Sequence, residues 1–366
     1  MEQSYRLELD GRPAPPELLD AVQSLDVEDH VDLAGIVRLR IGVAVASSGD
    51  AWSFVDEDMF PRLGRVRVQA RVGNAQATLV DAHVVEVRAA LDGEPSRSFL
   101  DVVAMDATAV MNLEERVRAW PGRSDADVAR EVFGEHGLDA DVEDTQPVWD
   151  EADSTLMQRG TDIRFLRGLA RRNGFECYVE TDPVTDRPTG HFHPPRLDGP
   201  PQGILTVGMG APTVDHFTVR HHMVGVADAE AHGVDAATLE VQDGAAEGSS
   251  LKSLGRDEAG KAGRRRVIVD AGGATEQVET VSQAMRDRTG WAVAAEGRLN
   301  TALYGKVLRA KRNVLVRGVG RRFGGTYRVE RVLHTFTEEG HVQHFTLRRN
   351  ALGLDTKKFV DREAGR

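Results

Sequence analysis

Cysteine is almost absent from this sequence, because Cys177 is the single one among 366 residues. A lone cysteine excludes an intrachain disulfide and a cysteine-rich zinc site, so the fold has to be held by its own core. Aromatic residues make up only 5% of the chain, which argues against a surface that stacks nucleobases. No run approaches the roughly 18 apolar residues of a membrane span. The start, MEQSYRLELDGRPAPP, lacks the basic and apolar regions of a secretory signal. We therefore expect neither a membrane span nor a signal peptide.

The charges are unbalanced, since 58 acidic side chains outnumber 46 basic ones and give a formal net charge of -12. Such a chain repels nucleic acid and anionic membranes as a whole, although a local basic patch can still bind an anion. We therefore expect no nucleic-acid partner. The length allows two or three domains of ordinary size, and 40% hydrophobic residues are enough for a real core.

Residues 1–120 are dominated by a period-two alternation of apolar and polar side chains. The alternation is clearest from Val37 to Ile41 and from Val66 to Val72, and glycine, asparagine and aspartate separate the runs. Alternating runs divided by turn residues are typical of antiparallel strands with one buried face. The pattern predicts a first β module, either a meander or a small barrel.

In residues 121–200 the spacing of the apolar residues changes from the period of strands to that of helices. Ser124 is placed to cap one helix, because its hydroxyl can accept a backbone N–H of the first turn. A second helix lies in the stretch QRGTDIRFLRGLARRNGFE, where Thr161 or Asp162 can act as the cap and Gly174 suits a left-handed end. The stretches FECYVETD and GHFHPP follow as a hairpin. We interpret this region as a small α/β insertion.

Residues 201–352 return to strands and form a second β module. Within it, residues 243–265 are rich in glycine, serine and alanine, which predicts a long flexible loop, and residues 275–295 are compatible with a helix. The segments 64–107 and 312–351 share a layout of short strand, turn and long meander, which favours two related β modules. The predicted fold is thus α+β and mainly β, with a small α/β insertion between two β modules.

The candidate chemical motifs each have a structural explanation that we favour. His191 and His193 flank Phe192 in HFHPP, so a strand would place both imidazoles on one face, where a metal could bind. No nearby carboxylate or cysteine completes a ligand set. The glycine-rich stretch GVGRRFGG lacks the lysine and hydroxyl residue of a phosphate loop and precedes a strand, so we interpret it as a turn.

Cys177 follows the expected helix end and has no histidine at a suggestive spacing, so we interpret it as a buried, inert thiol. In VLHTFTEEGHVQHFTL, a turn centred on Glu339 and Gly340 would place His334 opposite Phe345 in a half-buried pair. The basic run KAGRRR is interpreted as a solvated loop end. We therefore predict no catalytic, cofactor-binding or metal-binding residue, and no cofactor.

Residues 158–176 carry a combination that resembles the most recognisable element of the late control protein D family. The family comprises baseplate hub proteins of contractile phage tails and contractile injection systems, and the hub portion of VgrG-like proteins. FLDVVAMDATAVMNL resembles the end of its first module, and VRGVGRRFGGTYRVERVLHTF resembles part of its C-terminal module. The similarity covers about residues 5–352. The matching positions of the motif are Gln158, Thr161, Asp162, Phe165, Leu166, Leu169, Ala170, Asn173 and Gly174.

The resemblance implies a structural protein and no enzyme, with two tube-protein-like β-barrel modules around the insertion. It implies a homotrimer, whose ring of six modules adapts the sixfold inner tube to the trimeric spike. The partners it implies are further copies of the chain, the inner tube or a tube-initiator protein, the spike protein and other baseplate proteins. Assembly would take place in the bacterial cytoplasm, and the product would be a component of a phage-tail-like particle.

Residues 353–366 are a short charged tail in the place where VgrG-like chains continue into a spike. The resemblance therefore implies that the spike is carried on a separate chain. Two other functions stay open from the sequence. One is a cell-wall (peptidoglycan) hydrolase with a carboxylate pair in the insertion, where mutating one carboxylate such as Asp150 or Glu151 would abolish activity. The other is a monomeric β-rich ligand-binding protein.

Overall fold

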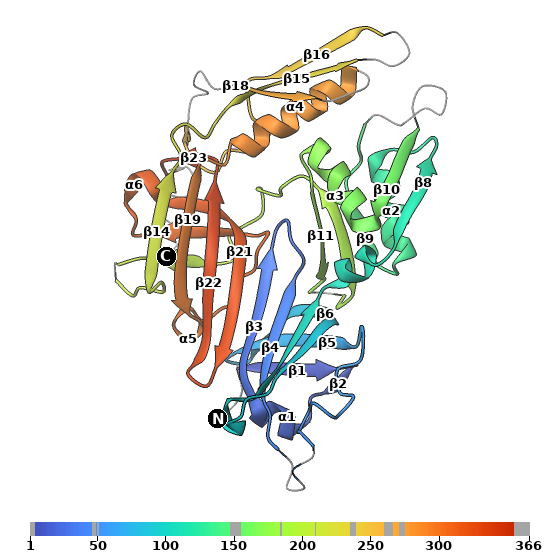
Figure 1. Cartoon of the computed structure of the whole chain (residues 1–366). Coiled ribbons are helices and arrows are strands. Elements are labelled where there is room, and N and C mark those ends of the chain that lie inside the picture. Colours follow the sequence, from blue (N-terminus) through green and yellow to red (C-terminus); the bar gives the residue numbers. More distant parts are fainter. Residues whose placement is uncertain are drawn as a thin grey trace.

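The computed structural model describes residues 4–45, 49, 51–146, 155–183, 185–208, 210–234, 239–259, 266–270 and 275–354. Figure 1 shows the first β module at the bottom in blue and cyan, the second in red on the left and the insertion in green on the right. Among the described residues, no helix is both long enough and apolar enough to span a membrane. The predicted fold class, α+β and mainly β, is confirmed.

The first β module is a curved antiparallel sheet with the strand order β3-β4-β7-β6-β5-β1-β2. Its apolar side chains alternate as predicted, so Val37, Leu39 and Ile41 are each no more than 1% exposed. They pack with their counterparts on the neighbouring strands into a core of their own. The elements are β1 (Tyr5–Leu9), β2 (Arg12–Pro13), α1 (Pro16–Ala21), β3 (Val22–His30), β4 (Ile36–Gly42), β5 (Arg65–Val72), β6 (Ala75–Ala90), η1 (Pro95–Arg97), β7 (Phe99–Met105) and η2 (Ala107–Asn112).

The second β module has the strand order β14-β19-β22-β21-β20-β13 and a separate core, which includes Val293, Val314 and Leu347. Two short strands, β17 and β23, form an additional pair at its edge. The elements are β13 (Ile204–Thr206), β14 (His216–His221), β17 (Asp257–Glu258), β19 (Val293–Asn300), α5 (Thr301–Tyr304), β20 (Asn313–Arg317), α6 (Gly320–Phe323), β21 (Gly325–Thr337), β22 (Gly340–Arg349) and β23 (Ala351–Leu352).

The shared sequence layout of the two modules corresponds to a shared strand order. In the first module β5, β6, β7, β4 and β3 are neighbours in that order, and in the second β20, β21, β22, β19 and β14 are. The long strands β6 and β21 each carry a register shift, between Val84 and Glu86 and between Val329 and Arg331. The outermost strands differ, because β1 is antiparallel to β5 whereas β13 is parallel to β20.

β21 joins the two modules because it has different neighbours along its length. Residues 325–328 pair with β20 of the second module, and residues 331–336 pair with residues 25–30 of β3 in the first. The modules therefore share one 13-stranded sheet. The local sequence does not predict β3, since its run VQSLDVEDH surrounds Leu25 and Val27 with polar and acidic side chains.

The insertion packs α2 and α3 against a ribbon of β8 and β10 and a sheet of β11, β12 and β9. Ser124 caps α2 as predicted, in a capping box with Asp127. The predicted boundary at residue 120 is wrong, because β8 pairs with β10 and Trp120 packs in the insertion's core. The elements are β8 (Glu115–Trp120), α2 (Asp125–Glu135), β9 (Asp139–Val142), β10 (Leu156–Thr161), α3 (Asp162–Asn173), β11 (Glu176–Thr181) and β12 (Pro188–His193).

A small unit caps the far end of the molecule and contains the helix predicted near residues 275–295. This cap unit consists of β15 (Asp228–Val234), β16 (Val241–Ala246), β18 (Arg266–Asp270) and α4 (Thr275–Thr289), shown in yellow and orange at the top of Figure 1. Its three strands form their own sheet, in the order β16-β15-β18, with α4 packed against it.

The described part of residues 243–265 does not form the long flexible loop that the sequence predicts. β16 continues to Ala246, and the Ser250 N–H donates to Asp287 Oδ1 of α4 at 2.8 Å. The small residues serve packing, because a side chain at Gly244 would stand 3.0 Å from Val278 of α4. Residues 260–265, including most of the basic run KAGRRR, lie outside the described residues.

The C-terminal hairpin has a different register from the predicted one. Thr337 pairs with Gly340 across a two-residue turn, so His334 stands opposite Gln343 and not opposite Phe345. Two-residue turns are favoured in hairpins because their twist matches that of the flanking strands. The prediction placed the turn too late, and the whole pairing moves with it.

Phe336 tests the joint between the modules, since it lies on β21 but packs in the core of the first module, 5.3 Å from the Tyr5 ring. Phe336→Ala should cost ~3–5 kcal/mol of unfolding free energy and increase hydrogen exchange in β4 and β7. Phe345→Ala truncates a ring of the second core and should increase exchange in β19 and β22 instead. Increased exchange confined to the second module in both variants would contradict the placement of Phe336.

Candidate functional site: the motif helix and the domain junction

Gln158, the first residue of the motif, is completely buried on β10. Its Oε1 accepts a hydrogen bond from Trp120 Nε1 at 3.2 Å, and its Nε2 donates to Asp162 Oδ1 at 2.6 Å. A buried amide without partners would cost ~1–3 kcal/mol, so these bonds favour one geometry. They fix both strands of the ribbon to the start of α3.

The start of α3 differs from the predicted cap. Thr161 is the N-cap residue, but its Oγ1 donates to Asn112 Oδ1 at 2.8 Å and makes no capping bond with the helix. Asp162 is buried, and its Oδ2 lies 2.8 Å from His136 Nε2 and 3.4 Å from Arg116 Nη1. Both side chains therefore connect α3 to neighbouring elements.

The apolar face of α3 lies in the core of the insertion, as its spacing predicts. Leu166, Leu169 and Ala170 are each no more than 3% exposed, and Phe165 packs half-buried at the edge. Cys177 belongs to the same core. Burial raises the pKa of the Cys177 thiol to about 12, which keeps it protonated and inert, in agreement with the sequence analysis.

Gly174 ends α3 with a φ of 69°, the left-handed conformation that the sequence predicts. A side chain at this position would stand 3.3 Å from Ala284 of α4, so the glycine also allows the insertion to contact the cap unit. Asn173 Nδ2 donates to Asp125 Oδ2 at 2.6 Å and joins the end of α3 to the start of α2. The end of the motif is thus a contact point of three helices.

The arginines of α3 have different surroundings. Arg172 Nε donates to Asp125 Oδ2 at 2.7 Å and strengthens the contact between α3 and α2. Arg164 is 69% exposed, and its closest carboxylate, that of Glu115, is 3.9 Å away. Arg167 and Arg171 line a cavity on another side of the helix. Of these four arginines, Arg164 and Arg171 are exposed, whereas Arg167 and Arg172 are partly buried.

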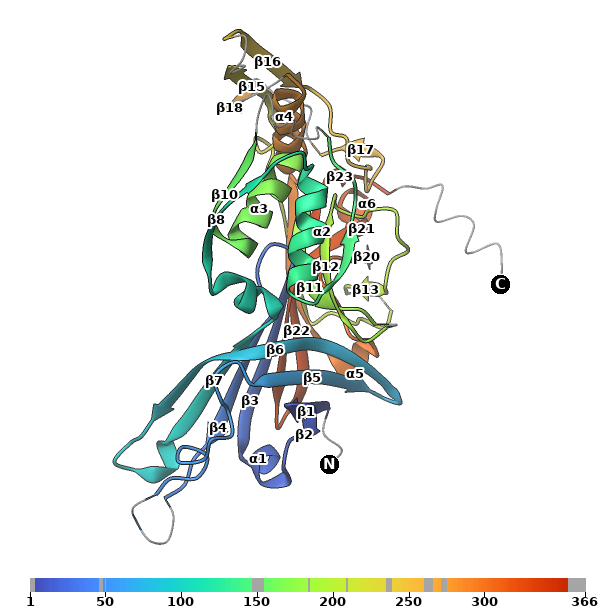
Figure 2. The same cartoon turned by 90° about the vertical axis from the view of Figure 1, so that its right-hand side faces the viewer.

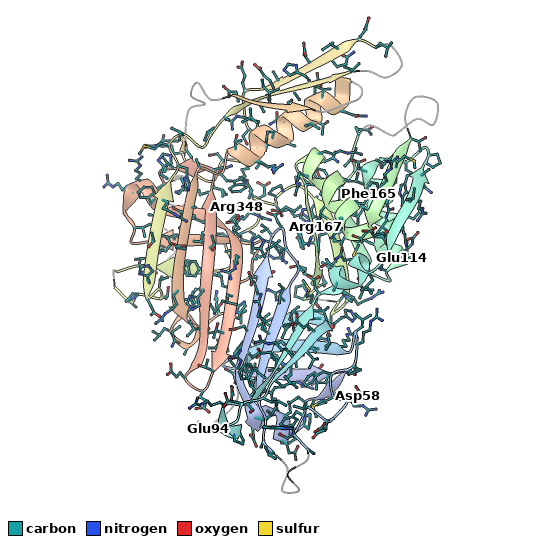
Figure 3. All side chains as sticks on the ribbon, viewed as in Figure 1. Asp58, Glu94, Glu114, Phe165, Arg167 and Arg348 are labelled. Atoms are coloured by element: carbon teal, nitrogen blue, oxygen red, sulfur yellow. The ribbon has the colours of Figure 1, made fainter. Side chains whose placement is uncertain are left out.

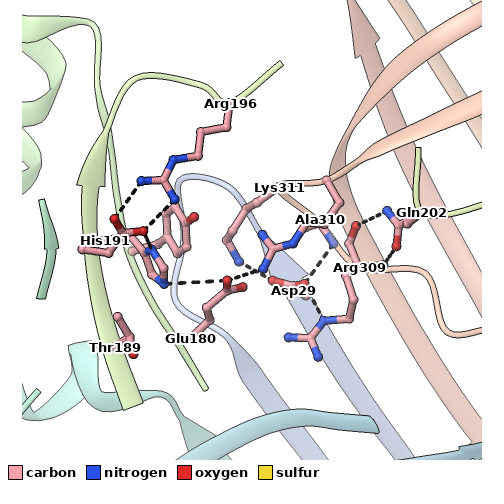
Figure 4. A network of polar contacts seen from close by, with 12 residues as sticks. Asp29, Glu180, Thr189, His191, Arg196, Gln202, Arg309, Ala310 and Lys311 are labelled. Carbon is pink, nitrogen blue, oxygen red and sulfur yellow. Dashed lines mark hydrogen bonds and ion pairs between the residues drawn. The ribbon is translucent and has the colours of Figure 1, made fainter. Parts of the chain in front are cut away.

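Asp29 of β3 lies where the first module, the insertion and the second module meet, and Figure 4 shows its surroundings. Its carboxylate binds the Lys311 ammonium, accepts the Ala310 N–H at 2.9 Å and lies 3.4 Å from Arg309 Nε. Burial alone would raise the pKa of Asp29, but Lys311 and Arg309 lower it below its usual value, so the group stays ionised.

Two carboxylates of β11 attach the insertion to the second module. Glu180 binds Arg312, which follows Lys311 directly in the chain. Glu176 accepts hydrogen bonds from Arg328, which is completely buried, and from Arg348 Nη2 at 3.0 Å. A buried ion pair is tolerated only when its charges and donors find partners, so these contacts fix the insertion in one position.

A cluster of Asp141, His191 and His193 corrects the sequence analysis, which found no carboxylate near the two histidines. β9 pairs in parallel with β12, so Asp141 Oδ2 lies 2.9 Å from His191 Nδ1, and the ligand atoms of all three residues lie within 4.8 Å of one another. Both oxygens of Asp141 also accept from Arg196 at 2.7 Å. Arg196 lowers the pKa of Asp141 to about 2, and burial lowers the pKa of both histidines. The guanidinium of Arg196 takes the place of a cation at Asp141, and Figure 4 shows Arg196 beside His191.

A cavity of about 310 Å³ opens beside the junction, lined by Asp29, Asp106 and Glu180 among others. Asp106 accepts the N–H groups of Gly35 and Thr108, and burial raises its pKa. Each of these carboxylates already has cations or backbone donors as partners, so their arrangement favours a fixed joint over proton transfer. The carboxylates considered for hydrolysis, Asp150 and Glu151, lie outside the described residues.

The fold of the chain is similar to that of solved phage tail proteins. The 43 kDa tail protein of prophage MuSo2 from Shewanella oneidensis matches with a TM-score of 0.64 at 14% identity, over 94% of this chain and 98% of that chain. The tail protein from Neisseria meningitidis MC58 matches with 0.64 at 10% identity, over 96% and 97%. The E. coli c3393 protein, a type VI secretion component with structural similarity to the T4 bacteriophage tail proteins gp27 and gp5, matches with 0.58 at 11% identity, over 94% and 76%. The chain therefore has the fold of phage tail proteins.

A comparison of the sequence with models of protein families also gives a match. The model of the Alg8 N-terminal domain family matches residues 5–338, and the chain belongs to that family. None of the curated proteins matches the chain. The late control protein D family, which the motif resembles, is not the family whose model matches, so that resemblance is supported at the level of the fold.

Leu166→Ala should lower the free energy of unfolding by ~2–5 kcal/mol, because the side chain is completely buried in the core of the insertion. Arg171→Ala changes an exposed residue of the same helix and should cost well under ~1 kcal/mol. Denaturant titration of both variants measures the difference. Equal, small losses in the two variants would mean that α3 does not pack through this face.

Lys311→Met should cost ~3–5 kcal/mol, because it leaves the buried carboxylate of Asp29 without its ammonium partner. Lys306→Met makes the same change at an exposed lysine a few residues earlier and should be close to neutral. Adding Asp29→Asn to Lys311→Met should recover part of the loss, since the uncompensated charge is then removed. Thermal unfolding of the four proteins checks this, and a loss at Lys311 no larger than at Lys306 would refute the role of the pair.

Proposed function

We propose that the chain is a structural baseplate hub protein of a contractile tail or a contractile injection system. The observation that carries the proposal is the similarity of fold to two phage tail proteins over at least 94% of each chain. The similarity to a type VI secretion component points to the same class of machine. In this role the chain works through matched surfaces, and we propose no catalytic activity for it.

The repeated strand order supports assembly into a ring. Within the chain, residues 331–336 of β21 pair with β3. The equivalent residues of β6, 85–90, pair only with β7 among the described strands, and β14, the equivalent of β3, pairs only with β19. Figure 2 shows this part of β6 extending away from the body with β7. We infer that β14 of one copy pairs with residues 85–90 of the next, which repeats the internal joint between copies.

Such a head-to-tail contact closes into a ring when the rotation between copies allows it. Two modules per chain give six modules in a homotrimer, the number that suits a sixfold inner tube on one side and a trimeric spike on the other. An open strand edge is a hazard in a monomer, and Val85 and Val87 are 43% and 44% exposed on the open part of β6. Pairing between copies would cover this edge.

The proposed partners are the inner tube or a tube-initiator protein, the spike protein and other baseplate proteins. This hub role is the one expected of the late control protein D family, which the motif of residues 158–174 resembles. In the proposal the motif is a structural joint between the insertion and the cap unit. Assembly takes place in the bacterial cytoplasm, and the product is a component of a phage-tail-like particle.

Val87→Lys should weaken the trimer about tenfold, equivalent to ~1.4 kcal/mol, since lysine on a strand edge opposes pairing with another strand. Val117→Lys makes the same change at an exposed valine of β8, away from the proposed contact, and should leave assembly unchanged. Light scattering over a concentration series measures the mass of each protein. A wild-type chain that stays monomeric at micromolar concentration would refute the trimer and favour a monomeric binding protein. Release of peptidoglycan fragments by the purified chain would favour the hydrolase.

A further inference from the structure

A second cavity, of about 270 Å³, lies where α3 faces the end of α4 and β22. Four arginines line it, Arg167 and Arg171 from α3, Arg288 from the last turn of α4 and Arg348 from β22. Figure 3 shows Arg167 and Arg348 in the space between the insertion and the second module. The ring of Trp291 forms part of the wall, and the Arg348 guanidinium lies 4.5 Å from it.

Positive charge is in excess in this cavity. The lining contains two carboxylates, those of Asp32 and Glu176, against the four guanidinium groups. Glu176 is already shared between Arg348 and the buried Arg328, which stands behind it. It therefore does not neutralise Arg167, and the lining keeps a surplus of at least two positive charges.

Two of the N–H donor atoms of Arg167 also lack hydrogen-bond acceptors among the described residues. In the part of the chain that the structure describes, its Nε and Nη2 are buried atoms without a partner, and so is Nε of Arg348. A buried guanidinium N–H without an acceptor costs free energy, so such groups are normally paired. Arg172, on the same helix, illustrates the paired case through its two bonds to Asp125. Arg167 lines the cavity together with three other arginines, so its unpaired donors and the surplus of positive charge indicate a place for an anionic acceptor.

We propose that this cavity binds a carboxylate of an acidic peptide segment supplied by a partner protein. The two oxygens of a carboxylate match the planar fork of a guanidinium and form paired, charge-assisted hydrogen bonds. The volume admits a short acidic side chain. A nucleic-acid backbone is disfavoured as the source of the anion, because the chain as a whole carries a net charge of -12 and repels a polyanion.

The site extends the proposed hub role without depending on it, since all of its residues come from one copy of the chain. Its walls come from the insertion, from the end of α4 in the cap unit and from the second module. A bound carboxylate would therefore connect these three parts and favour one arrangement of them. The partner segment would act as a latch whose strength depends on salt concentration, because charge pairs at a surface cavity are screened.

A blocked oligoglutamate peptide is the probe, added to the full chain in isothermal titration calorimetry at low salt. Saturable binding is expected for the wild type, with about tenfold weaker binding for Arg167→Met and for Arg171→Ala. Arg164→Met removes the same charge from the same helix at an exposed site and should keep wild-type affinity. The peptide should raise the Tm of the wild type and of Arg164→Met, but not that of Arg167→Met.

Tripolyphosphate, titrated in the same way, separates the two kinds of anion. Binding of tripolyphosphate without binding of the peptide would overturn the assignment to a carboxylate. Equal weakening by Arg164→Met and Arg167→Met would show a non-specific charge effect and would overturn the cavity as the site. Absence of peptide binding to the folded wild type at low salt would overturn it as well. If the chain is monomeric but still binds the peptide, the proposed ring is refuted while the proposed carboxylate site stands.

Discussion

The pairing of β3 with β21 is the constraint on which the rest of the molecule depends. It joins two β modules with separate cores into one sheet, and it places Asp29 where water is largely excluded. A carboxylate in such a place needs cations, and the run from Arg309 to Arg312 provides them. Because Arg312 also binds Glu180, the same run attaches the insertion. The relative positions of the three parts are therefore coupled through one buried set of charges.

Arginine–carboxylate pairs recur at several contacts between elements of this chain. Arg172 and Asp125 join the two helices of the insertion, Arg328 and Glu176 join the insertion to the second module, and Arg196 holds Asp141 beside the histidines. These contacts explain why so many arginines can be part of an acidic protein without forming a basic surface. Arg167 departs from the pattern, since two of its buried donors have no hydrogen-bond partner among the described residues.

Local patterns predicted much of the architecture, because the alternation of apolar residues in the strands and the helical spacing of α3 depend on nearest neighbours in sequence. Prediction failed where a distant partner decides the outcome. β3 was missed because its acidic residues are matched by side chains of β21, about 300 residues later. The segment after residue 243 looked like a loop because its small side chains hide the close packing of α4. Asp141 lies beside His191 because β9 and β12 pair in parallel, and no spacing of residues in the sequence indicates this pairing.

The sequence by itself determined the two β modules, the helical spacing of apolar residues in the insertion and the motif from Gln158 to Gly174. Each of these follows from local periodicity, capping and turn chemistry. Only the tertiary structure decided which charges are paired, which strand edges stay open and which side chains of α3 face a cavity. The physical reason is that ion pairs and strand neighbours connect residues far apart in the chain. Their partners are therefore fixed by the path of the whole sheet and not by the residues beside them.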